Sequence, residues 1–378
     1  MIFLTYNDSF SGIYKSQVID VCSFMEKELG IKTRLVAFVS ARTYFQQRKL
    51  IKAACNEALV LPMFPKVRFW KRNRGMLKLA CSLLKERIIW ARGPFACNLA
   101  LGLQEKKVID KVLFDARGAY LAELSEYDVV GDELVKKDIA RLEKSALSGS
   151  AAQLAVSQRL QAWWKKQYDF SPQNCEVIPC TLSESFLVQF PAEEEVKEKR
   201  AQLGFKHEDI VLVYSGSSAG WQSFRLVDEY LYTLMKQNAR IKLLFLSNRI
   251  PQQARVFAEF SERIISKWVK PGEVRNLLLA ADHGLLIREK SVTNEVSSPV
   301  KFAEYLSCGL SVTISEGIGD FTDFVRENDC GSVVSATTSF EPLPYSRKKQ
   351  NHDLAIKHFS KNSGHIKQAY ANLLASLK

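Results

Sequence analysis

The chain has 378 residues, 47% of them hydrophobic and 25% charged, and its formal net charge is +12. This composition is typical of folded domains and excludes a disordered chain, and the length suits two domains. No run of 18 apolar residues occurs, so the sequence predicts no membrane-spanning helix.

In the first half of the chain, short β-rich runs alternate with helical patterns. The clearest helical patterns are residues 13–29 and 133–148. We predict strands at residues 2–6, 34–39, 58–61, 87–91, 111–115, 153–156 and 176–178.

The second half repeats this alternation, and the chain ends in an amphipathic helical pattern at residues 362–378. Short apolar strands that alternate with helices predict parallel sheets covered on both faces. The predicted fold class is therefore α/β with two Rossmann-like domains. The predicted strands of this half are 209–215, 241–246, 262–266, 283–287, 311–315 and 331–334.

A charged segment at residues 191–204 marks the join between the two halves. We predict four parts: a Rossmann-like domain at 1–185, a linker at 186–205, a second Rossmann-like domain at 206–350, and C-terminal helices at 351–378. We expect these last helices to pack back toward the first domain.

The eight cysteines are scattered, with no C-x-x-C pair and no histidine at metal-ligand spacing. Such cysteines are typical of small buried residues in a reducing compartment. The first residues lack the basic region of a signal peptide, and we interpret them as a strand. We therefore expect a cytoplasmic protein.

The basic residues gather in one segment. Residues 42–92 contain thirteen Lys or Arg and only Glu57 and Glu86 as acidic residues. Cations mixed with aromatic side chains suit an anionic membrane surface, and the alternative is a solvated basic face. No RNA- or DNA-binding motif accompanies the segment, so we expect no nucleic acid partner. The candidate contact residues are Lys66, Arg68, Trp70, Lys71 and Arg72.

The stretch SSPVKFAEYLSCGLSV at 297–312 predicts a helix with Ser298 as N-cap and Pro299 at its first position. Lys301 then lies in the first turn, where a cation opposes the helix dipole, and Glu304 follows one turn later. Free backbone N–H groups beside an ammonium group can bind phosphate, and a nearby carboxylate can accept from a sugar diol. The alternative is a surface Lys–Glu pair.

This stretch resembles the donor-binding segment of glycosyltransferase family 4, a family of retaining enzymes with the GT-B fold. The segments VLVYSGSSAGWQS (211–223), AADHGLLIRE (280–289) and FDARGAYLAELSEYD (114–128) resemble the family in order and spacing. The resemblance implies two Rossmann-like domains whose sheets face an interdomain cleft. It also implies that the first domain binds the acceptor and the second binds a nucleoside diphosphate sugar.

Within this resemblance, Glu304 matches the family's ribose-binding carboxylate, Lys301 is the implied diphosphate cation, and Ser298 is a phosphate or sugar contact. Val296 stands where the family has a first carboxylate, a departure that we interpret as a subfamily trait.

Other donor-binding candidates follow the strands of both halves. The loop after strand 209–215 supplies Gly216 and Ser217, with Arg225 on the next helix, although a structural turn would give the same pattern. Arg288 ends strand 283–287 and could equally be a solvated side chain. Gly12 opens the first helix, where the family lets the donor phosphate approach.

The acceptor domain supplies the remaining candidates. Asp8 and Ser11 lie in the loop before the first helix, where a helix-capping role is the alternative. Asp115 and Arg117 end strand 111–115, in a region where relatives use a His, and no His precedes residue 207 here. The resemblance therefore implies catalytic roles for Asp115, Arg117, Lys301 and Glu304.

The implied activity is that of a retaining hexosyltransferase that acts in surface polysaccharide biosynthesis. The donor would be a nucleoside diphosphate sugar, and the acceptor a glycan or lipid-linked glycan at the inner face of the plasma membrane. We expect no metal and no cofactor, because cations can neutralise the leaving diphosphate and no D-x-D motif is present.

Two other function classes compete with this reading. One is a catalytically silent GT-B protein that binds nucleotide sugar or scaffolds an enzyme. The other is a NAD-dependent oxidoreductase, which the absence of a G-x-G-x-x-G motif disfavours.

Overall fold

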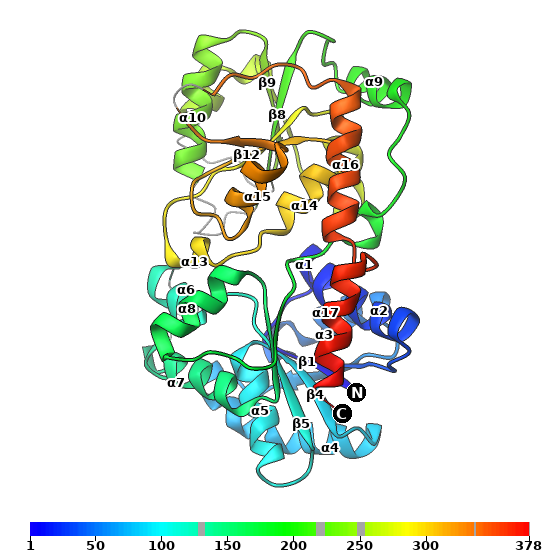
Figure 1. Ribbon diagram of the computed structural model, residues 1–378, viewed down its shortest axis with the longest axis vertical. Helices are drawn as coiled ribbons and strands as arrows, with labels where there is room; N and C mark the ends of the chain where they lie inside the picture. The colour runs from blue at the N-terminus through cyan, green and yellow to red at the C-terminus, as the bar shows by residue number, and fades with distance from the viewer. Residues whose placement is uncertain (128–132, 217–223, 248–253, 336–337, 378) are drawn as a thin grey trace. The chain divides into compact units, whose positions relative to one another are not determined.

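The computed structural model describes residues 1–127, 133–216, 224–247, 254–335 and 338–377 (Figure 1). The chain divides into two compact units. Unit 1 comprises Met1–Ser183, Val296–Ser298 and Lys361–Lys378, and unit 2 comprises Glu184–Glu295 and Pro299–Ser360. The C-terminal segment therefore belongs to the same unit as the N-terminus.

Unit 1 is built on a seven-stranded sheet with the order β3-β2-β1-β4-β5-β6-β7. Neighbouring strands in this sheet are parallel. All five residues of β1 are buried, as expected for a strand covered on both faces. The strands are β1 Ile2–Tyr6, β2 Arg34–Ser40, β3 Leu59–Met63, β4 Ile88–Arg92, β5 Lys111–Asp115, β6 Ala152–Ala155 and β7 Cys175–Val177.

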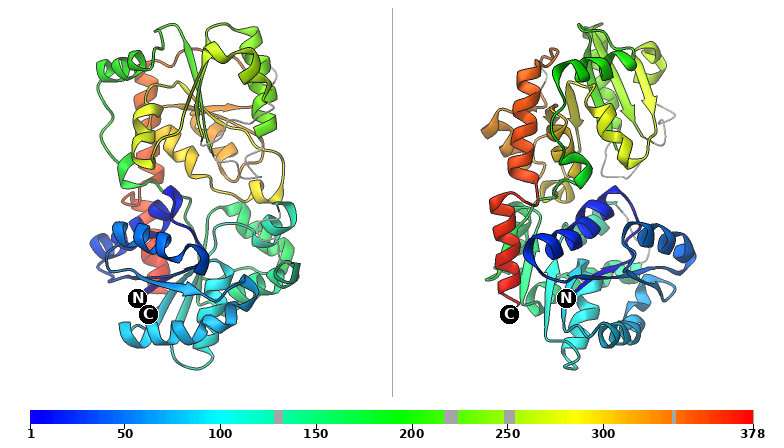
Figure 2. Two further views of the ribbon diagram at one scale, coloured as in Figure 1. Left: turned by 180° about the vertical axis from the view of Figure 1, so that it is seen from behind. Right: turned by 90° about the vertical axis from the view of Figure 1, so that its right-hand side faces the viewer.

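Helices lie on both faces of the unit 1 sheet (Figure 2). The crossovers β1–β2 and β2–β3 run in one direction along the sheet, and β3–β4 and β4–β5 run in the other. Because such crossovers are right-handed, α2 and α3 cover one face and α4 and α5 cover the other. The helices are α1 Gly12–Tyr14, α2 Asp20–Leu29, α3 Tyr44–Ala54, α4 Arg74–Leu84, α5 Gly93–Gln104, α6 Tyr120–Tyr127, α7 Glu133–Gly149, α8 Gln158–Tyr168 and α17 Gly364–Ala375.

Helix α17 closes the core of unit 1 with an aromatic stack. The ring of Tyr370 lies 5.8 Å from Trp90 of β4 and 5.2 Å from Phe24 of α2. Trp90 in turn stacks on Phe3 of β1 at 6.1 Å. Trp90, Phe3 and Tyr370 are fully buried, so the end of the chain completes the core begun by the first strand.

Unit 2 is built on a six-stranded parallel sheet with the order β10-β9-β8-β11-β12-β13. Its strands are β8 Ile210–Ser215, β9 Ile241–Leu246, β10 Ile264–Lys267, β11 His283–Leu286, β12 Ser311–Ile314 and β13 Gly331–Val333. Its helices are α9 Glu193–Gln202, α10 Phe224–Gln237, α11 Arg255–Glu259, α12 Val274–Leu278, α13 Val292–Glu295, α14 Val300–Ser307, α15 Phe321–Asn328 and α16 Tyr345–Phe359.

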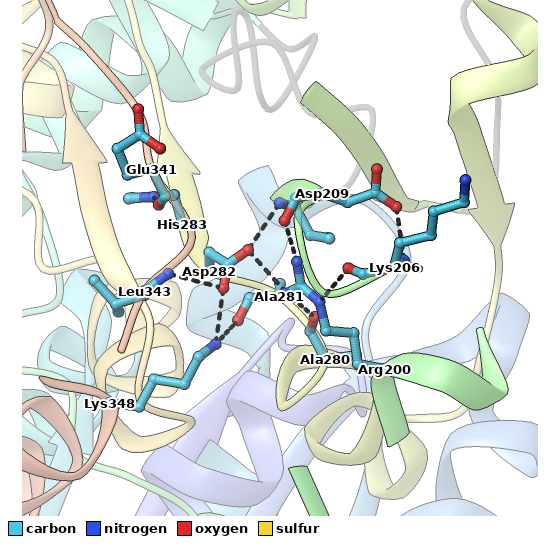
Figure 3. Close-up of polar contacts among 11 residues, drawn as sticks. Arg200, Lys206, Asp209, Ala280, Ala281, Asp282, His283, Glu341, Leu343 and Lys348 are labelled. Atoms are coloured by element: carbon cyan, nitrogen blue, oxygen red, sulfur yellow. Dashed lines mark hydrogen bonds and ion pairs between the residues drawn. The ribbon is translucent and has the colours of Figure 1, made fainter. Parts of the chain in front are cut away.

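A buried polar cluster fastens the amino ends of β8 and β11 to two helices (Figure 3). At its centre, Asp282 Oδ2 accepts from Arg200 Nη1 of α9 and from Val211 N, both at 2.9 Å. Asp282 Oδ1 lies 3.2 Å from Lys348 Nζ of α16. Although burial raises it, the two cations hold the pKa of Asp282 below its ordinary value. The charged segment predicted as a linker is thus fixed to unit 2 by Arg200.

The predicted α/β class with two Rossmann-like domains is confirmed, and the thirteen predicted strands are present with ends that differ from the prediction by at most two residues. The helix predicted at 13–29 instead has three parts, because residues Lys15–Ile19 form a π-helical turn between α1 and α2. This wide turn carries the buried Gln17, whose Nε2 donates to Thr181 O at 2.7 Å. Within the described ranges, no helix is both long enough and apolar enough to cross a membrane.

Candidate functional site

Helix α14 begins one residue later than predicted. Pro299 occupies its N-cap position with an extended backbone, and Val300 is the first helical residue. The Oγ of Ser298 accepts a hydrogen bond from Cys180 N at 2.8 Å. The capping role predicted for Ser298 is therefore wrong, because its hydroxyl group is used to hold a segment 118 residues away.

The predicted Lys301–Glu304 pair forms within the first turns of α14. Lys301 Nζ lies 2.6 Å from Glu304 Oε2, and the two side chains are 30% and 14% exposed. The first turn of α14 holds no acidic residue. The positive end of the helix dipole and an accessible ammonium group therefore lie together, with a carboxylate one turn away.

Tyr305 anchors α14 to the sheet of unit 2. Its phenol oxygen accepts a hydrogen bond from Ser215 N, at the carboxyl end of β8, at 2.9 Å. Its ring packs so closely on Gly284 of β11 that any side chain there would overlap it. Sequence reasoning missed this pair, although a glycine inside a predicted strand is a signal of close approach.

Arg288 lies at the same carboxyl edge, just beyond β11. It is only 9% exposed, so it is not a solvated side chain. Its backbone N donates to Ser315 Oγ at 2.9 Å, and its Nη1 donates to Asn294 Oδ1 at 3.2 Å. Burial raises the pKa of Tyr214 to about 12, and the charge of Arg288 opposes that increase. Arg288 therefore interacts with residues of β8, of α13 and of the segment that follows β12.

The β8–α10 loop and the start of α10 contain three predicted donor-binding residues, Gly216, Ser217 and Arg225. Gly216 N donates to Leu246 O at 3.2 Å and so continues the β8–β9 ladder. Ser217 lies outside the described residues. Arg225 pairs with Glu229 Oε1 on the surface of α10 at 3.0 Å and is 82% exposed. The donor-binding roles of these three residues stay predictions.

These positions share one edge of unit 2, since the carboxyl ends of parallel strands meet there. The edge presents the amino end of α14, the ammonium group of Lys301 and the guanidinium group of Arg288. Helix N-termini with nearby cations stabilise phosphate groups. A carboxylate such as Glu304, one turn along, can accept hydrogen bonds from hydroxyl groups of the same ligand.

In unit 1, Asp115 and Arg117 form a buried ion pair at the end of β5. Arg117 Nε lies 2.6 Å from Asp115 Oδ1, and the two side chains are 8% and 0% exposed. Trp90 Nε1 donates to Asp115 Oδ2 at 3.2 Å, and Arg117 Nη1 reaches Gln17 Oε1 at 3.5 Å. These contacts describe a pair that fastens β5 to β4 and the π-helical turn, and the catalytic role predicted for both residues stays a prediction.

The loop after β1 contains the other acceptor-domain candidates. Ser11 Oγ accepts from Tyr14 N at 3.1 Å, so it caps α1, the alternative role weighed from the sequence. Gly12 is exposed at the start of α1. Asp8 Oδ2 lies 3.5 Å from Nε of Arg92, the last residue of β4. Arg92 was not singled out from the sequence, although it is a strand-end cation followed by glycine.

The basic segment is divided between two faces of unit 1. Its cations on α3 lie on one face, and those that follow β3 lie on the other, because the two crossovers run in opposite directions. The basic residues that are continuous in the sequence therefore do not form one continuous surface.

Trp70 is also corrected as a surface contact, since it is only 5% exposed. Lys71 Nζ and Arg74 Cζ lie 5.6 Å and 5.5 Å from the centre of its ring.

The other cations of this turn lie over Phe69. The guanidinium carbons of Arg68 and Arg72 lie 5.0 Å and 4.6 Å from the centre of its ring. Lys66 stands just before this turn with a φ of 67°. The turn thus keeps its cations outside and buries its tryptophan.

In the part of the chain that the structure describes, no group of three His, Cys, Asp or Glu side chains could hold a metal ion.

The sequence matches no protein-family model, and no curated protein matches it. Solved structures do match it along its whole length. HepE from Anabaena in complex with UDP has a TM-score of 0.73 at 11% identity, over 99% of each chain. The chain has the GT-B fold.

Two further GT-B neighbours agree. A glycosyltransferase from Rickettsia africae gives a TM-score of 0.70 at 15% identity, over 100% of this chain and 98% of that one. The lipopolysaccharide outer core galactosyltransferase WaaB gives 0.65 at 13% identity, over 100% of both chains. These likenesses establish the GT-B fold, and the assignment to family 4 stays a resemblance.

Proposed function

We propose that this chain is a glycosyltransferase that takes its sugar from a nucleoside diphosphate sugar. The observation that carries the proposal is the Lys301–Glu304 pair, 2.6 Å apart at the amino end of α14. A lysine at that end of a helix opposes the helix dipole, and a bound anionic ligand would offset that cost. HepE, which shares the fold, has been solved with UDP and with UDP and glucose.

Each group at this edge has a distinct role in the proposal. Lys301 and the first N–H groups of α14 hold the diphosphate, and Arg288 adds a second positive charge. Glu304 accepts hydrogen bonds from the ribose hydroxyl groups. As the glycosidic bond breaks, the leaving diphosphate gains negative charge, which these fixed groups stabilise.

We propose the retaining stereochemistry and the metal-independent mechanism of family 4, because the sequence of α14 resembles that family. In this proposal Lys301 and Arg288 take the place of a metal ion at the diphosphate. In this proposal Gly216 and Ser298 also contact the donor.

We propose a glycan or lipid-linked glycan as the acceptor, in the biosynthesis of a surface polysaccharide. WaaB, a GT-B neighbour, is a lipopolysaccharide outer core galactosyltransferase. Helix α4 supports a peripheral position on an anionic membrane surface, because Leu79 and Leu83 are 60% and 68% exposed one turn apart. Lys78 and Lys85 flank these leucines, and Arg72 precedes them in the chain.

Donor chemistry is tested by incubating the protein with UDP-, GDP- and ADP-sugars and measuring release of the nucleoside diphosphate. We expect one donor to be consumed, and Glu304→Ala and Lys301→Ala to reduce the rate at least about tenfold. Lys197→Ala is the matched control, since Lys197 forms an exposed intrahelical pair with Glu193 at 3.0 Å. Equal rates in all four proteins would contradict the proposal.

A catalytically silent GT-B protein is the second candidate. The observation that favours it is Val296, which is 2% exposed at the place where the resemblance implies a sugar-binding carboxylate. Binding of a nucleotide sugar that Lys301→Ala abolishes, without turnover of any donor and acceptor offered, would favour this candidate.

Membrane association is tested by co-sedimentation with vesicles of neutral lipid, with and without an anionic lipid. We expect binding only with the anionic lipid, and loss of binding in the Leu79→Ser/Leu83→Ser variant. Phe45→Ser is the matched control, because Phe45 is 83% exposed on α3, on the other face of the sheet. Equal binding to vesicles with and without the anionic lipid, or unchanged binding of the Leu79→Ser/Leu83→Ser variant, would contradict the membrane proposal.

A further inference from the structure

Polar side chains from three elements converge at the carboxyl edge of the unit 1 sheet. Asp8 follows β1, Arg92 ends β4, and Tyr120 and Glu123 lie on α6. The strands β1, β4 and β5 are neighbours in the sheet. The charges of Arg92, Glu123 and Asp8 all act on the phenol of Tyr120. These four groups therefore form one cluster.

The guanidinium group of Arg92 is mostly buried in this cluster, and one of its nitrogens makes no hydrogen bond within the described residues. Its side chain is only 13% exposed, and its contact with Asp8 is a long one, at 3.5 Å. Its buried Nη1 has no hydrogen-bond partner in the described part of the chain. A buried guanidinium nitrogen without a partner costs free energy, which a ligand hydroxyl group would recover.

Two glycines show that the cluster is built into the fold. Gly93, with a φ of 80°, would bring an added Cβ to 3.2 Å from the Tyr120 hydroxyl group. An added Cβ at Gly118 would overlap Oε1 of Glu123, so the carboxyl group would have to move aside. The glycines at 93 and 118 therefore leave room for Tyr120 and Glu123 where they lie.

Charge decides which ligand the cluster suits. Asp115 is already paired with Arg117, so Arg92 is left with the carboxyl groups of Asp8 and Glu123. The guanidinium group of Arg92 is already balanced by the carboxyl group of Asp8, so a phosphate group would meet no excess positive charge and is disfavoured. Burial and the neighbouring Glu143 raise the pKa of Glu123 to about 8, so near neutral pH this carboxyl group can both donate and accept.

We propose that Asp8, Arg92, Tyr120 and Glu123 form a subsite for a neutral sugar residue of the acceptor. Each hydroxyl group of a sugar is both a donor and an acceptor, which matches a guanidinium, a phenol and two carboxyl groups in one place. The inference rests on the proposed glycosyltransferase function and adds the chemical class of the acceptor residue.

The test uses saturation-transfer NMR of the full chain with glucose, galactose and N-acetylglucosamine, and with inorganic phosphate as the anionic probe. We expect at least one saccharide to bind without competition from phosphate. Glu123→Leu should weaken that binding at least about tenfold. Glu105→Gln, at the far end of α5, is the control and should bind as the unmodified protein does.

The Glu123→Gln variant separates the hydrogen bonding of this side chain to the saccharide from a structural effect of the substitution. Glutamine keeps a donor and an acceptor at this position, so we expect the saccharide to bind it at neutral pH. Binding to the unmodified protein should weaken between about pH 7 and about pH 9 as Glu123 ionises beside Glu126, Glu143, Asp8 and Arg92. Glu123→Gln should lose much of this dependence.

Nucleotide-sugar binding, followed by thermal shift in the same proteins, separates this inference from the proposed function. A donor that stabilises every variant equally, together with saccharide binding lost only in Glu123→Leu, supports both. Saccharide binding that is unchanged in Glu123→Leu, absent from the unmodified protein, or displaced by phosphate overturns the subsite, whatever the donor result.

Discussion

The phenol oxygen of Tyr305 accepts the backbone N–H of Ser215 at 2.9 Å, which joins the middle of α14 to the carboxyl end of β8. This bond, together with the packing of the Tyr305 ring on Gly284, helps to hold the candidate donor helix at the sheet edge where Arg288 also lies. The position of Lys301 and Glu304 therefore depends on a residue that need not touch the ligand.

Tyr305→Phe should destabilise unit 2 and weaken the binding of a nucleotide sugar. It keeps the ring but leaves the buried Ser215 N–H without a partner, at a cost of about 1–3 kcal/mol in the free energy of unfolding. Urea unfolding measures that cost. Tyr232→Phe, which removes an exposed bond to Glu259 Oε2, should change it by less than about 0.5 kcal/mol. Equal effects of the two substitutions would contradict the anchoring role.

Arg117→Met should destabilise unit 1 by about 3–5 kcal/mol, because it leaves the carboxylate of Asp115 buried without its cation. The Asp115→Leu/Arg117→Met double variant should recover much of this loss, since it removes both charges. Unfolding by urea, followed by circular dichroism, tests both. A variant that unfolds as the unmodified protein does, yet turns over no donor, would instead support the catalytic role predicted from the sequence.

Lys348→Met should destabilise unit 2 by about 3–5 kcal/mol, since the buried Asp282 would lose one of its two cations. The exposed pair of Arg240 and Glu341, 2.9 Å apart, supplies the comparison. Arg240→Met should cost less than about 1 kcal/mol. Similar melting temperatures for the two variants would show that the cluster of Figure 3 is not what fastens α16.

The buried carboxyl group of Glu143 should make unit 1 less stable as the pH rises. Burial raises its pKa to about 7 from an ordinary 4.5, although Tyr120 N, Leu121 N and the hydroxyl group of Tyr168 all donate to it. Between these two pKa values the folded state binds more protons than the unfolded state. The stability that the protonated carboxyl group of Glu143 contributes is therefore fully present below about pH 4.5, and it is lost as the pH rises through about 7.

Urea unfolding between about pH 5 and about pH 8 measures this dependence. Glu143→Gln should reduce the loss of stability with pH, and the buried Glu123, whose pKa is also raised, should supply the remaining part. Glu105→Gln, on the surface, should leave the slope unchanged. A slope that is the same in all three proteins would contradict the assignment.

The strands could be predicted because parallel strands are buried on both faces and read as continuous apolar runs. Residues 210–215 are an example, since all six are buried in β8. The pair of Lys301 and Glu304 could also be predicted, because it depends only on helical spacing.

The contacts between distant segments could not be predicted. Ser298 is a good N-cap by residue type, but its hydroxyl group bonds Cys180. Trp70 lies among cations in the sequence, yet it packs edge-on against Phe95, at 6.3 Å, and is buried. The partners of Arg92 come from the loop after β1 and from α6, so its place at a strand end before a glycine does not show which residues it contacts.

The central claim is that the amino end of α14 holds the diphosphate of a nucleotide sugar, and calorimetric titration tests it most directly. The unmodified protein, Lys301→Ala and Lys197→Ala would each be titrated with UDP-, GDP- and ADP-sugars. We predict that one nucleotide binds the unmodified protein and Lys197→Ala equally, and binds Lys301→Ala about 10–100-fold more weakly. Equal affinity in all three proteins, or no binding of any nucleotide sugar, would contradict the claim.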